Sequence, residues 1–201
     1  MRAASVLTTE QSEIQSLARE FAATELRPHA ERWDAERALD PDIVDKLAEM
    51  GLLGLRVPEA FGGLGLDLTT LSVALTEVSW GEAAVGLLLL IHNGPVVELL
   101  VRHGSDEQKA RYLSALAGGE RVGAFALSEP DAGSDARSLS TRAERVDQGW
   151  RIRGEKRWVT NGRRAGVVIV FAQTEEGVSA FLVEPDTDGY DVSGQERTMG
   201  M

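Results

Sequence analysis

Residues 118–127 read GGERVGAFAL, and within this stretch the sequence changes from a helical pattern to a strand pattern. Two glycines end the last helical segment, and the apolar run Val122–Leu127 that follows has the length of a buried strand. Before the change, apolar residues recur every three or four positions. After it, short apolar runs alternate with turns. We therefore expect an α+β protein with two separate domains, a helical one at residues 1–118 and a β domain at residues 119–201.

The amino-terminal half predicts an all-α helical bundle. Thr8 and Gln11 have the spacing of a capping box at the start of the first helix. Pro28 should end or kink that helix, because proline cannot continue the hydrogen-bond ladder. Asp40 followed by Pro41 predicts the start of the next helix, with proline at the first helical position.

The centre of this half contains the stretch Val85–Ile91, which is apolar on all sides and therefore predicts a central, buried helix. The residues His92–Pro95 interrupt it, so the apolar run is too short to cross a bilayer and we expect no membrane span. Another helix is expected to open at Pro95. The last helix of this half begins with a second capping-box pattern, Ser105 with Gln108.

The carboxyl-terminal half predicts an incomplete antiparallel β-barrel-like domain. The expected strands are Val122–Leu127, Thr141–Val146, Trp150–Arg153, Val167–Ala172, Val178–Val183 and, as a sixth, Tyr190–Val192. The residues Asp147–Gly149 predict a hairpin turn. Five or six short strands do not easily close a sheet, and the sequence stops without a polar tail. We therefore expect the β domain to be truncated.

Composition and charge exclude several classes of function. The formal net charge is −11, which repels a polyanion, so we expect no nucleic-acid partner. The chain has no cysteine, and His29, His92 and His103 are not in a metal-ligand spacing, so we expect no metal site. The helical pattern begins near Thr8, which leaves no room for a signal or transit peptide. The expected location is the cytoplasm.

The stretch Ser128–Asp135 is the first candidate site. It follows an apolar strand and combines small and polar residues. Gly133 lets the backbone approach a ligand closely, and Ser128 and Ser134 offer hydroxyl donors. Consecutive backbone N–H groups in such a loop can bind an anion. The alternative is an ordinary surface loop rich in turn residues.

The stretch Lys156–Gly162 is the second candidate. Trp158, taken as part of a strand, is more often a core residue than a cofactor contact. Beside Thr160, however, a flat aromatic ring could cover one edge of a planar ring system. By comparison, a lone histidine such as His92 at a helix break is usually a structural hydrogen-bonding residue rather than a catalytic one.

Together these stretches resemble the acyl-CoA dehydrogenase family. The strongest match is Ala126–Asp135, which fits that family's main signature of Ser/Thr, Glu and Pro followed by Gly, Ser and Asp. Lys156–Gly162 resembles its second signature. The segment Gly104–Leu113 and the glycine loop Phe61–Leu66 also match, so the resemblance extends along essentially the whole chain.

The resemblance implies a flavoenzyme in which FAD lies between the middle β domain and a second helical bundle, with a neighbouring subunit contributing. Carried over position by position, the residues implied to contact FAD are Phe125, Leu127, Ser128, Gly133, Ser134, Trp158, Val159 and Thr160. The same resemblance implies that Ser134 also contacts the acyl-CoA substrate.

The implied reaction is α,β-dehydrogenation of an acyl-CoA thioester, with a glutamate base and electron transfer to an electron-transfer flavoprotein. The base belongs to a carboxyl-terminal half that this sequence lacks, and the family counterpart of Glu129 is not the base. We therefore expect the chain to be inactive alone and part of a homo- or hetero-oligomer in the complete enzyme. The alternatives are a non-catalytic remnant or binding module, or a related flavoenzyme: an acyl-CoA oxidase, a carrier-protein thioester dehydrogenase or a flavin monooxygenase.

Overall fold

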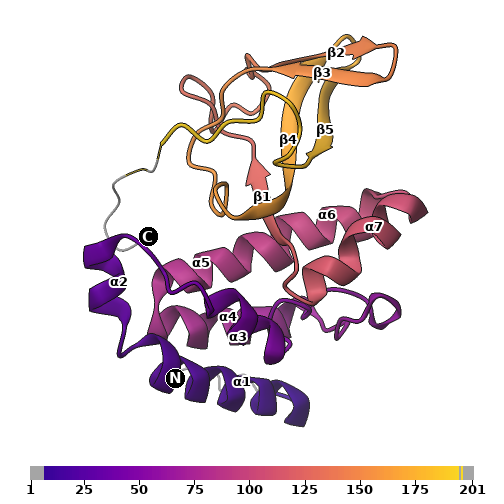
Figure 1. The fold of residues 1–201 in the computed structure, drawn as a ribbon. Helices are drawn as coiled ribbons and strands as arrows, with labels where there is room; N and C mark the ends of the chain where they lie inside the picture. Colours follow the sequence, from indigo (N-terminus) through magenta and orange to yellow (C-terminus); the bar gives the residue numbers. More distant parts are fainter. Residues whose placement is uncertain (1–6, 195, 197–201) are drawn as a thin grey trace. The chain divides into compact units, whose positions relative to one another are not determined.

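The structure is a computed structural model that describes residues 7–194 and 196. The chain divides into two compact units: the first ends at Gly119 and the second is Glu120–Glu196. The first unit is helical and the second contains the strands, so the α+β fold class is confirmed (Figure 1).

Helices make up the first unit, and many begin where the sequence predicts. They are α1 (Thr9–Phe21), η1 (Ala22–Leu26), α2 (Ala30–Glu36), α3 (Ile43–Glu49), η2 (Glu59–Phe61), α4 (Leu68–Gly81), α5 (Ala83–Ile91), η3 (His92–Val97), α6 (Glu98–His103) and α7 (Asp106–Ala117). Both predicted capping boxes are present: Thr8 with Gln11 starts α1, and Ser105 with Gln108 starts α7. The polar side chains satisfy backbone N–H groups that have no partner within the helix.

Two helix starts differ from expectation. Helix α3 begins at Ile43, because Asp40 and Pro41 form a turn in which the Asp40 carbonyl accepts from the Ile43 N–H at 3.2 Å. Pro95 does not open a helix, since it lies inside the π-helical segment η3 that joins α5 to α6. A proline removes one ladder hydrogen bond and crowds the preceding turn, and a wider π-helical turn accommodates both effects.

The continuous helix Ala83–His103 is therefore longer than predicted. Its 21 residues have a mean hydropathy of 1.8, so by length and composition this helix could cross a membrane. The expectation that His92–Pro95 would cut it short is wrong. Half of its most apolar window is buried in protein, and His92 and Asn93 are fully buried.

The core of the helical unit forms where α1, α4 and α5 pack on the residues around α3. The buried polar side chains of this unit include Asn93 and His92. Asn93 donates to the Leu52 carbonyl at 2.9 Å and accepts from the Arg56 N–H at 3.2 Å, which ties the long helix to the loop after α3. Burial lowers the pKa of His92 to about 4, against opposing hydrogen bonds with the backbone of Leu53 and Leu116. His92 is thus neutral at pH 7.

The second unit is an open mixed sheet. Its strands are β1 (Val122–Ala126), β2 (Arg142–Val146), β3 (Gly149–Arg153), β4 (Ala165–Thr174) and β5 (Gly177–Val183). Strand β4 pairs with β1 and β2 in parallel and with β5 in an antiparallel hairpin, while β2 and β3 form the predicted hairpin. The antiparallel expectation is therefore right for the two hairpins and wrong for the other pairs. Long connections separate β4 from β1 and β2, and such connections permit parallel pairing.

The predicted strand Tyr190–Val192 is not a strand. Instead, the Tyr190 hydroxyl donates to the Gly162 carbonyl at 3.0 Å, and its ring packs on the small core formed around Ala124 and Val168. This contact fixes the segment after β5 on the loop after Lys156, without adding to the sheet.

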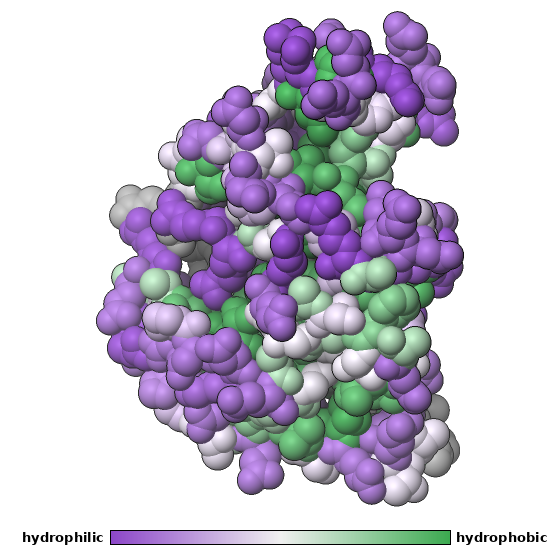
Figure 2. Space-filling model, turned by 45° about the vertical axis from the view of Figure 1, so that its right-hand side comes forward, coloured by the Kyte–Doolittle hydropathy of each residue, from purple (hydrophilic) through white to green (hydrophobic). Residues whose placement is uncertain are grey.

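Large apolar side chains are partly exposed in both units, and Figure 2 shows hydrophobic patches set among hydrophilic residues. The exposed large apolar side chains are Leu17, Leu64, Leu68, Trp80 and Leu90 in the helical unit and Trp150, Trp158, Val178 and Val192 in the β unit. Trp158 is 63% exposed. It is therefore not a core residue.

Candidate functional site

Strand β1, together with the residue after it, contains the first two residues predicted to contact the cofactor, Phe125 and Leu127. Its residues alternate between the two faces of the sheet, so Ala124 and Ala126 join the small core while Phe125 points to the other face. The Phe125 ring lies 5.1 Å from the Phe171 ring of β4, measured between ring centroids. Leu127, directly after the strand, is half-buried. Phe125 and Leu127 are thus placed by a strand that is held on β4.

The turn of the first signature, Glu129–Ala132, follows the end of β1 after two intervening residues. The Glu129 N–H donates to the Ala132 carbonyl at 2.8 Å, which closes the turn and leaves Gly133 and Ser134 exposed. A Cβ atom added to Gly133 would meet nothing within 4 Å, so the space beside this glycine is open. Within the described residues, the N–H groups of Gly133 and Ser134 donate no hydrogen bond. They remain available to a polar group of a ligand.

The second signature, Lys156–Gly162, is a loop and not the strand that the sequence suggests. Trp158 has φ of 55° and Asn161 has φ of 66°, a left-handed conformation that is costly for a side chain as large as tryptophan. Asn161 tolerates this conformation better, and its side-chain amide donates to the Gly123 carbonyl at 3.0 Å. Val159 packs on the small core. The loop therefore turns the Trp158 ring outward while it anchors the neighbouring residues.

The structure brings the two signatures together. The Arg157 N–H donates to the Ser128 carbonyl at 2.8 Å, and the Lys156 ammonium donates to the Leu127 carbonyl at 2.9 Å. The segments are 29 residues apart in sequence at this contact. Of the predicted residues, Leu127 and Ser128 thus lie beside the loop that carries Trp158. No hydrogen bond links Gly133 or Ser134 to this loop among the described residues.

Glu129 is the residue whose role the sequence does not reveal. It is 2% exposed, and its carboxylate accepts from Ser140 (N–H at 2.6 Å and hydroxyl at 2.5 Å), from the Thr141 N–H at 3.0 Å and from the Lys156 ammonium at 2.8 Å. Burial by itself raises the pKa of Glu129, but the hydrogen bonds from Lys156 and from Ser140–Thr141 outweigh it and hold the pKa far below its usual range.

This electrostatic environment decides what Glu129 can do. A general base near neutral pH needs a pKa close to the working pH and a free lone pair directed at the substrate. Glu129 stays ionised and its oxygens are occupied, so it does not serve as that base. An acidic residue between an apolar strand and a proline, with a lysine in the second signature, is the signal that could have suggested a buried pair.

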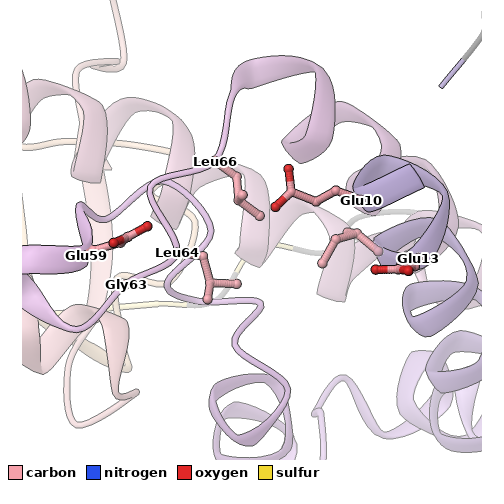
Figure 3. Close-up of a pocket in the computed structure, with 7 residues that line it drawn as sticks. Glu10, Glu13, Glu59, Gly63, Leu64 and Leu66 are labelled. Atoms are coloured by element: carbon pink, nitrogen blue, oxygen red, sulfur yellow. The ribbon is translucent and has the colours of Figure 1, made fainter. Parts of the chain in front are cut away.

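The helical unit contains a separate cleft of about 500 Å³ (Figure 3). It is lined by Glu10, Glu13, Ile14, Glu59, Gly63, Leu64 and Leu66. The carboxylates come from α1 and η2, and the leucines come from the loop between η2 and α4. Because carboxylates repel phosphate groups, this cleft suits an apolar or cationic group and not a nucleotide. None of the predicted cofactor contacts lies in it.

Two family models match the chain. The model described as "Acyl-CoA dehydrogenase, N-terminal domain" matches residues 8–120, and the model described as "Acyl-CoA dehydrogenase, middle domain" matches residues 124–201. The first range covers the helical unit. The second contains both signatures and every residue predicted to contact the cofactor.

Known proteins show the same similarity. An acyl-CoA dehydrogenase of Bacillus subtilis (strain 168) is 38% identical over 200 residues, which cover 97% of this chain and 53% of that protein. The crystal structure of an acyl-CoA dehydrogenase complexed with FAD from Bacillus anthracis has a TM-score of 0.89 at 33% identity, covering 96% of this chain and 34% of that one.

A chain from the structure titled as an electron transferring flavoprotein of Acidaminococcus fermentans has a TM-score of 0.88 at 35% identity, covering 93% of this chain and 50% of that one. The present chain spans about half the length of the curated relatives that it matches.

Proposed function

We propose that this chain, which belongs to the acyl-CoA dehydrogenase family, provides the part of an FAD-dependent acyl-CoA dehydrogenase that holds one wall of the flavin ring and part of the acyl-CoA site. The observation that carries this proposal is the hydrogen bond of 2.8 Å from the Arg157 N–H to the Ser128 carbonyl. It joins the two signature segments beside an exposed, flat indole ring.

The residues fit a flavin in three respects. The Trp158 ring is 63% exposed and can stack on a planar ring system, where aromatic pairs gain favourable contact. The Ser128 hydroxyl can donate to a polar edge of that ring. Gly133 stands in open space with available N–H groups beside it, so a ligand can approach the backbone closely. These features support FAD as the cofactor, as in the Bacillus anthracis relative.

When bound, FAD supplies the redox chemistry by accepting the hydride that leaves the substrate. The residues of this chain orient and shield the reaction. Ser128 fixes the ring edge, and Trp158 covers ring surface and excludes water from it. Ser134 and the N–H of Gly133 contribute to the acyl-CoA site. The α-proton is removed by a glutamate that we assign to no residue of this chain, since Glu129 is committed to its hydrogen bonds.

We further propose that the substrate is an acyl-CoA thioester and that the electron acceptor is an electron-transfer flavoprotein. The names of the matched relatives support the substrate class, and the similarity to the Acidaminococcus fermentans chain supports flavoprotein electron transfer. A homo- or hetero-oligomer that supplies the remaining FAD contacts completes the proposed enzyme.

The proposal is tested by titrating the purified chain with FAD and by assaying it with a saturated acyl-CoA and an artificial electron acceptor. We expect saturable FAD binding that weakens in Trp158→Ala and is unchanged in Trp150→Ala, an equally aromatic but unrelated site. We also expect no turnover above the protein-free control. Equal FAD affinity of both variants would contradict a role for Trp158 in binding the flavin ring. No FAD binding by the unaltered chain would also contradict the proposal, and it would favour a non-catalytic module. Turnover of the acyl-CoA above the control would contradict the expectation that this chain alone supplies no catalytic base.

A further inference from the structure

We propose that Glu129 and Lys156 are positioning residues: as a buried ion pair they clamp the loop that carries Trp158 to the end of β1. The claim that they position the flavin-binding residues rests on the proposed function. The clamp itself is a statement about the protein without any ligand, so it can be tested independently.

Lys156 is the centre of the clamp. Its ammonium group donates to the Leu127 carbonyl at 2.9 Å and to the Glu129 carboxylate at 2.8 Å, and its side chain is only 10% exposed. Leu127 lies directly after β1, and Glu129 lies in the signature turn itself. A single buried lysine therefore joins the second signature to the first on either side of Ser128.

Glu129 anchors the clamp to the sheet. Its carboxylate takes hydrogen bonds from Ser140 and Thr141, which lie directly before β2, in addition to the bond from Lys156. The Thr141 carbonyl in turn accepts from the Gln173 N–H of β4 at 2.8 Å. The ion pair is thus held by the segment directly before β2, which is itself bound to β4. Each donor compensates part of the cost of burying a charge.

The clamp acts on Trp158 through the backbone. Lys156 and Trp158 are separated by Arg157 alone, whose N–H donates to the Ser128 carbonyl at 2.8 Å. On the other side of Trp158, the Asn161 side chain is bound to the Gly123 carbonyl at 3.0 Å. Contacts at both ends of the loop can hold Trp158 at its unfavourable φ of 55°, a conformation that persists only when its surroundings enforce it.

A general contribution to stability is the alternative role for this ion pair. The β unit offers a matched control, the pair between Arg121 and Glu184, with an N–O distance of 2.7 Å. Arg121 also donates to the Gly166 carbonyl, so this pair likewise bridges segments far apart in sequence. Arg121 lies directly before β1 and Glu184 directly after β5, so both lie outside the two signatures in sequence. Loss of either pair weakens the unit, but only loss of the clamp should release the Trp158 loop.

The test is amide hydrogen exchange, followed by NMR, in the chain without FAD. The variants are Lys156→Met and Glu129→Gln, with Glu184→Gln as control. We expect the Arg157 amide to exchange roughly tenfold faster, or more, in both clamp variants relative to the β4 amides of the same sample. The control should change the Arg157 and β4 amides in parallel. Parallel change in the clamp variants as well would overturn the clamp.

Lys156→Arg provides rescue by a conservative change and guards against misfolding. It keeps the positive charge and the donors, so slow exchange of the Arg157 amide should largely return. Should Lys156→Met not fold, Glu129→Gln decides the question, because it removes the charge while keeping the size of the side chain. Fast exchange in Lys156→Arg equal to that of the folded Lys156→Met or Glu129→Gln would contradict a role for the charge pair.

FAD titration of the same variants distinguishes a failure of the clamp from a failure of the proposed function. If the clamp sets the flavin wall, FAD affinity falls in Glu129→Gln and is kept in Glu184→Gln. If the unaltered chain binds no FAD while the exchange result holds, the proposed function fails and the clamp stands. If FAD affinity falls without release of the Arg157 amide, the clamp fails and the flavin site stands.

Discussion

Glu129 and His92 are both buried ionisable side chains, yet the surroundings keep the first charged and the second neutral. Glu129 has a buried lysine and a set of N–H and hydroxyl donors within hydrogen-bond distance. His92 lies in the apolar core of the helical unit, where burial lowers its pKa to about 4 despite hydrogen bonds with backbone groups. Burial excludes a charge unless an opposite charge and specific hydrogen bonds accompany it.

The different surroundings of Glu129 and His92 also reflect different roles, since Glu129 lies in the candidate site and His92 lies in the helical unit. The partners of Glu129 come from both signatures and from the segment directly before β2, so the charged residue organises the candidate site. His92, by contrast, is fully buried in the helical unit and forms hydrogen bonds with the backbone of Leu53 and Leu116. The predictions below test whether this division holds, beginning with the largest effect.

Replacing Lys156 with methionine is expected to have the largest effect. It leaves the carboxylate of Glu129 buried without its counter-charge, and loss of one partner of a buried pair costs about 3 to 5 kcal/mol. The β unit should therefore unfold at clearly lower urea concentration, measured by the fluorescence of Trp150 and Trp158.

The control for this change is Arg157→Met. Arg157 pairs with Glu155 at 3.2 Å on the surface, and an exposed pair contributes roughly 1 kcal/mol or less. The backbone N–H of Arg157 is retained in this variant. Equal destabilisation by Lys156→Met and Arg157→Met would show that the Glu129 charge is not effectively buried.

The stability of the helical unit should depend on pH through the protonation of His92. Its pKa of about 4 in the folded state lies below the usual 6.5, so the unfolded chain binds the proton more readily. The stabilisation is therefore fully present above pH 6.5 and declines as the pH falls towards 4. The free energy of unfolding should drop by roughly 3 kcal/mol across this window.

His92→Gln should reduce that slope, whereas His103→Gln, a change at an exposed position, should leave it intact. The measurement is urea unfolding at several pH values, followed by circular dichroism. A slope that survives in His92→Gln would mean that another group titrates in the window and that His92 is not the neutral core residue described here. The ion pair of Glu129 should affect only the acidic end of this range, because the carboxyl of the unfolded chain begins to take up a proton as the pH approaches its ordinary pKa of 4.5.

Asn161→Ala should have the smallest effect of the three. It removes the hydrogen bond to the Gly123 carbonyl and places alanine at a φ of 66°, for a combined cost of about 1 to 2 kcal/mol. Asn161→Gly removes the bond but suits the backbone, so it should cost less. Urea unfolding of the β unit distinguishes them. Equal losses would indicate that the side-chain hydrogen bond alone anchors this end of the loop.

Local sequence patterns predicted much of the fold. The capping boxes predicted at Thr8 and Ser105 are confirmed, because each depends only on residues three positions apart. The hairpin turn at Asp147–Gly149 was equally local. Parallel pairing of β1 with β4 was missed, since strand order depends on contacts between distant segments. The π-helical turn at Pro95 was also missed, because tertiary packing overrides the tendency of proline to end a helix.

For the site, the sequence located the segments but not their internal geometry. The two signatures do lie side by side, as the family resemblance implied, through the bond between Arg157 and Ser128. Aromatic residues favour strands, which predicts a strand at Trp158, whereas a left-handed φ turns its ring outward in a loop. The role of Glu129 depends on Lys156 and on the start of β2, and no local pattern specifies such a three-way contact.

The flavin wall itself is tested most directly by locating FAD on the protein. The indole N–H signals of Trp33, Trp80, Trp150 and Trp158 can be followed by NMR in the isotope-labelled chain while FAD is added. The account predicts that the Trp158 signal and the amide signals of Ser128 and Gly133 shift together with one saturation curve, while the Trp33 and Trp80 signals stay in place. A saturating shift at Trp33 or Trp80 with Trp158 unchanged would contradict it.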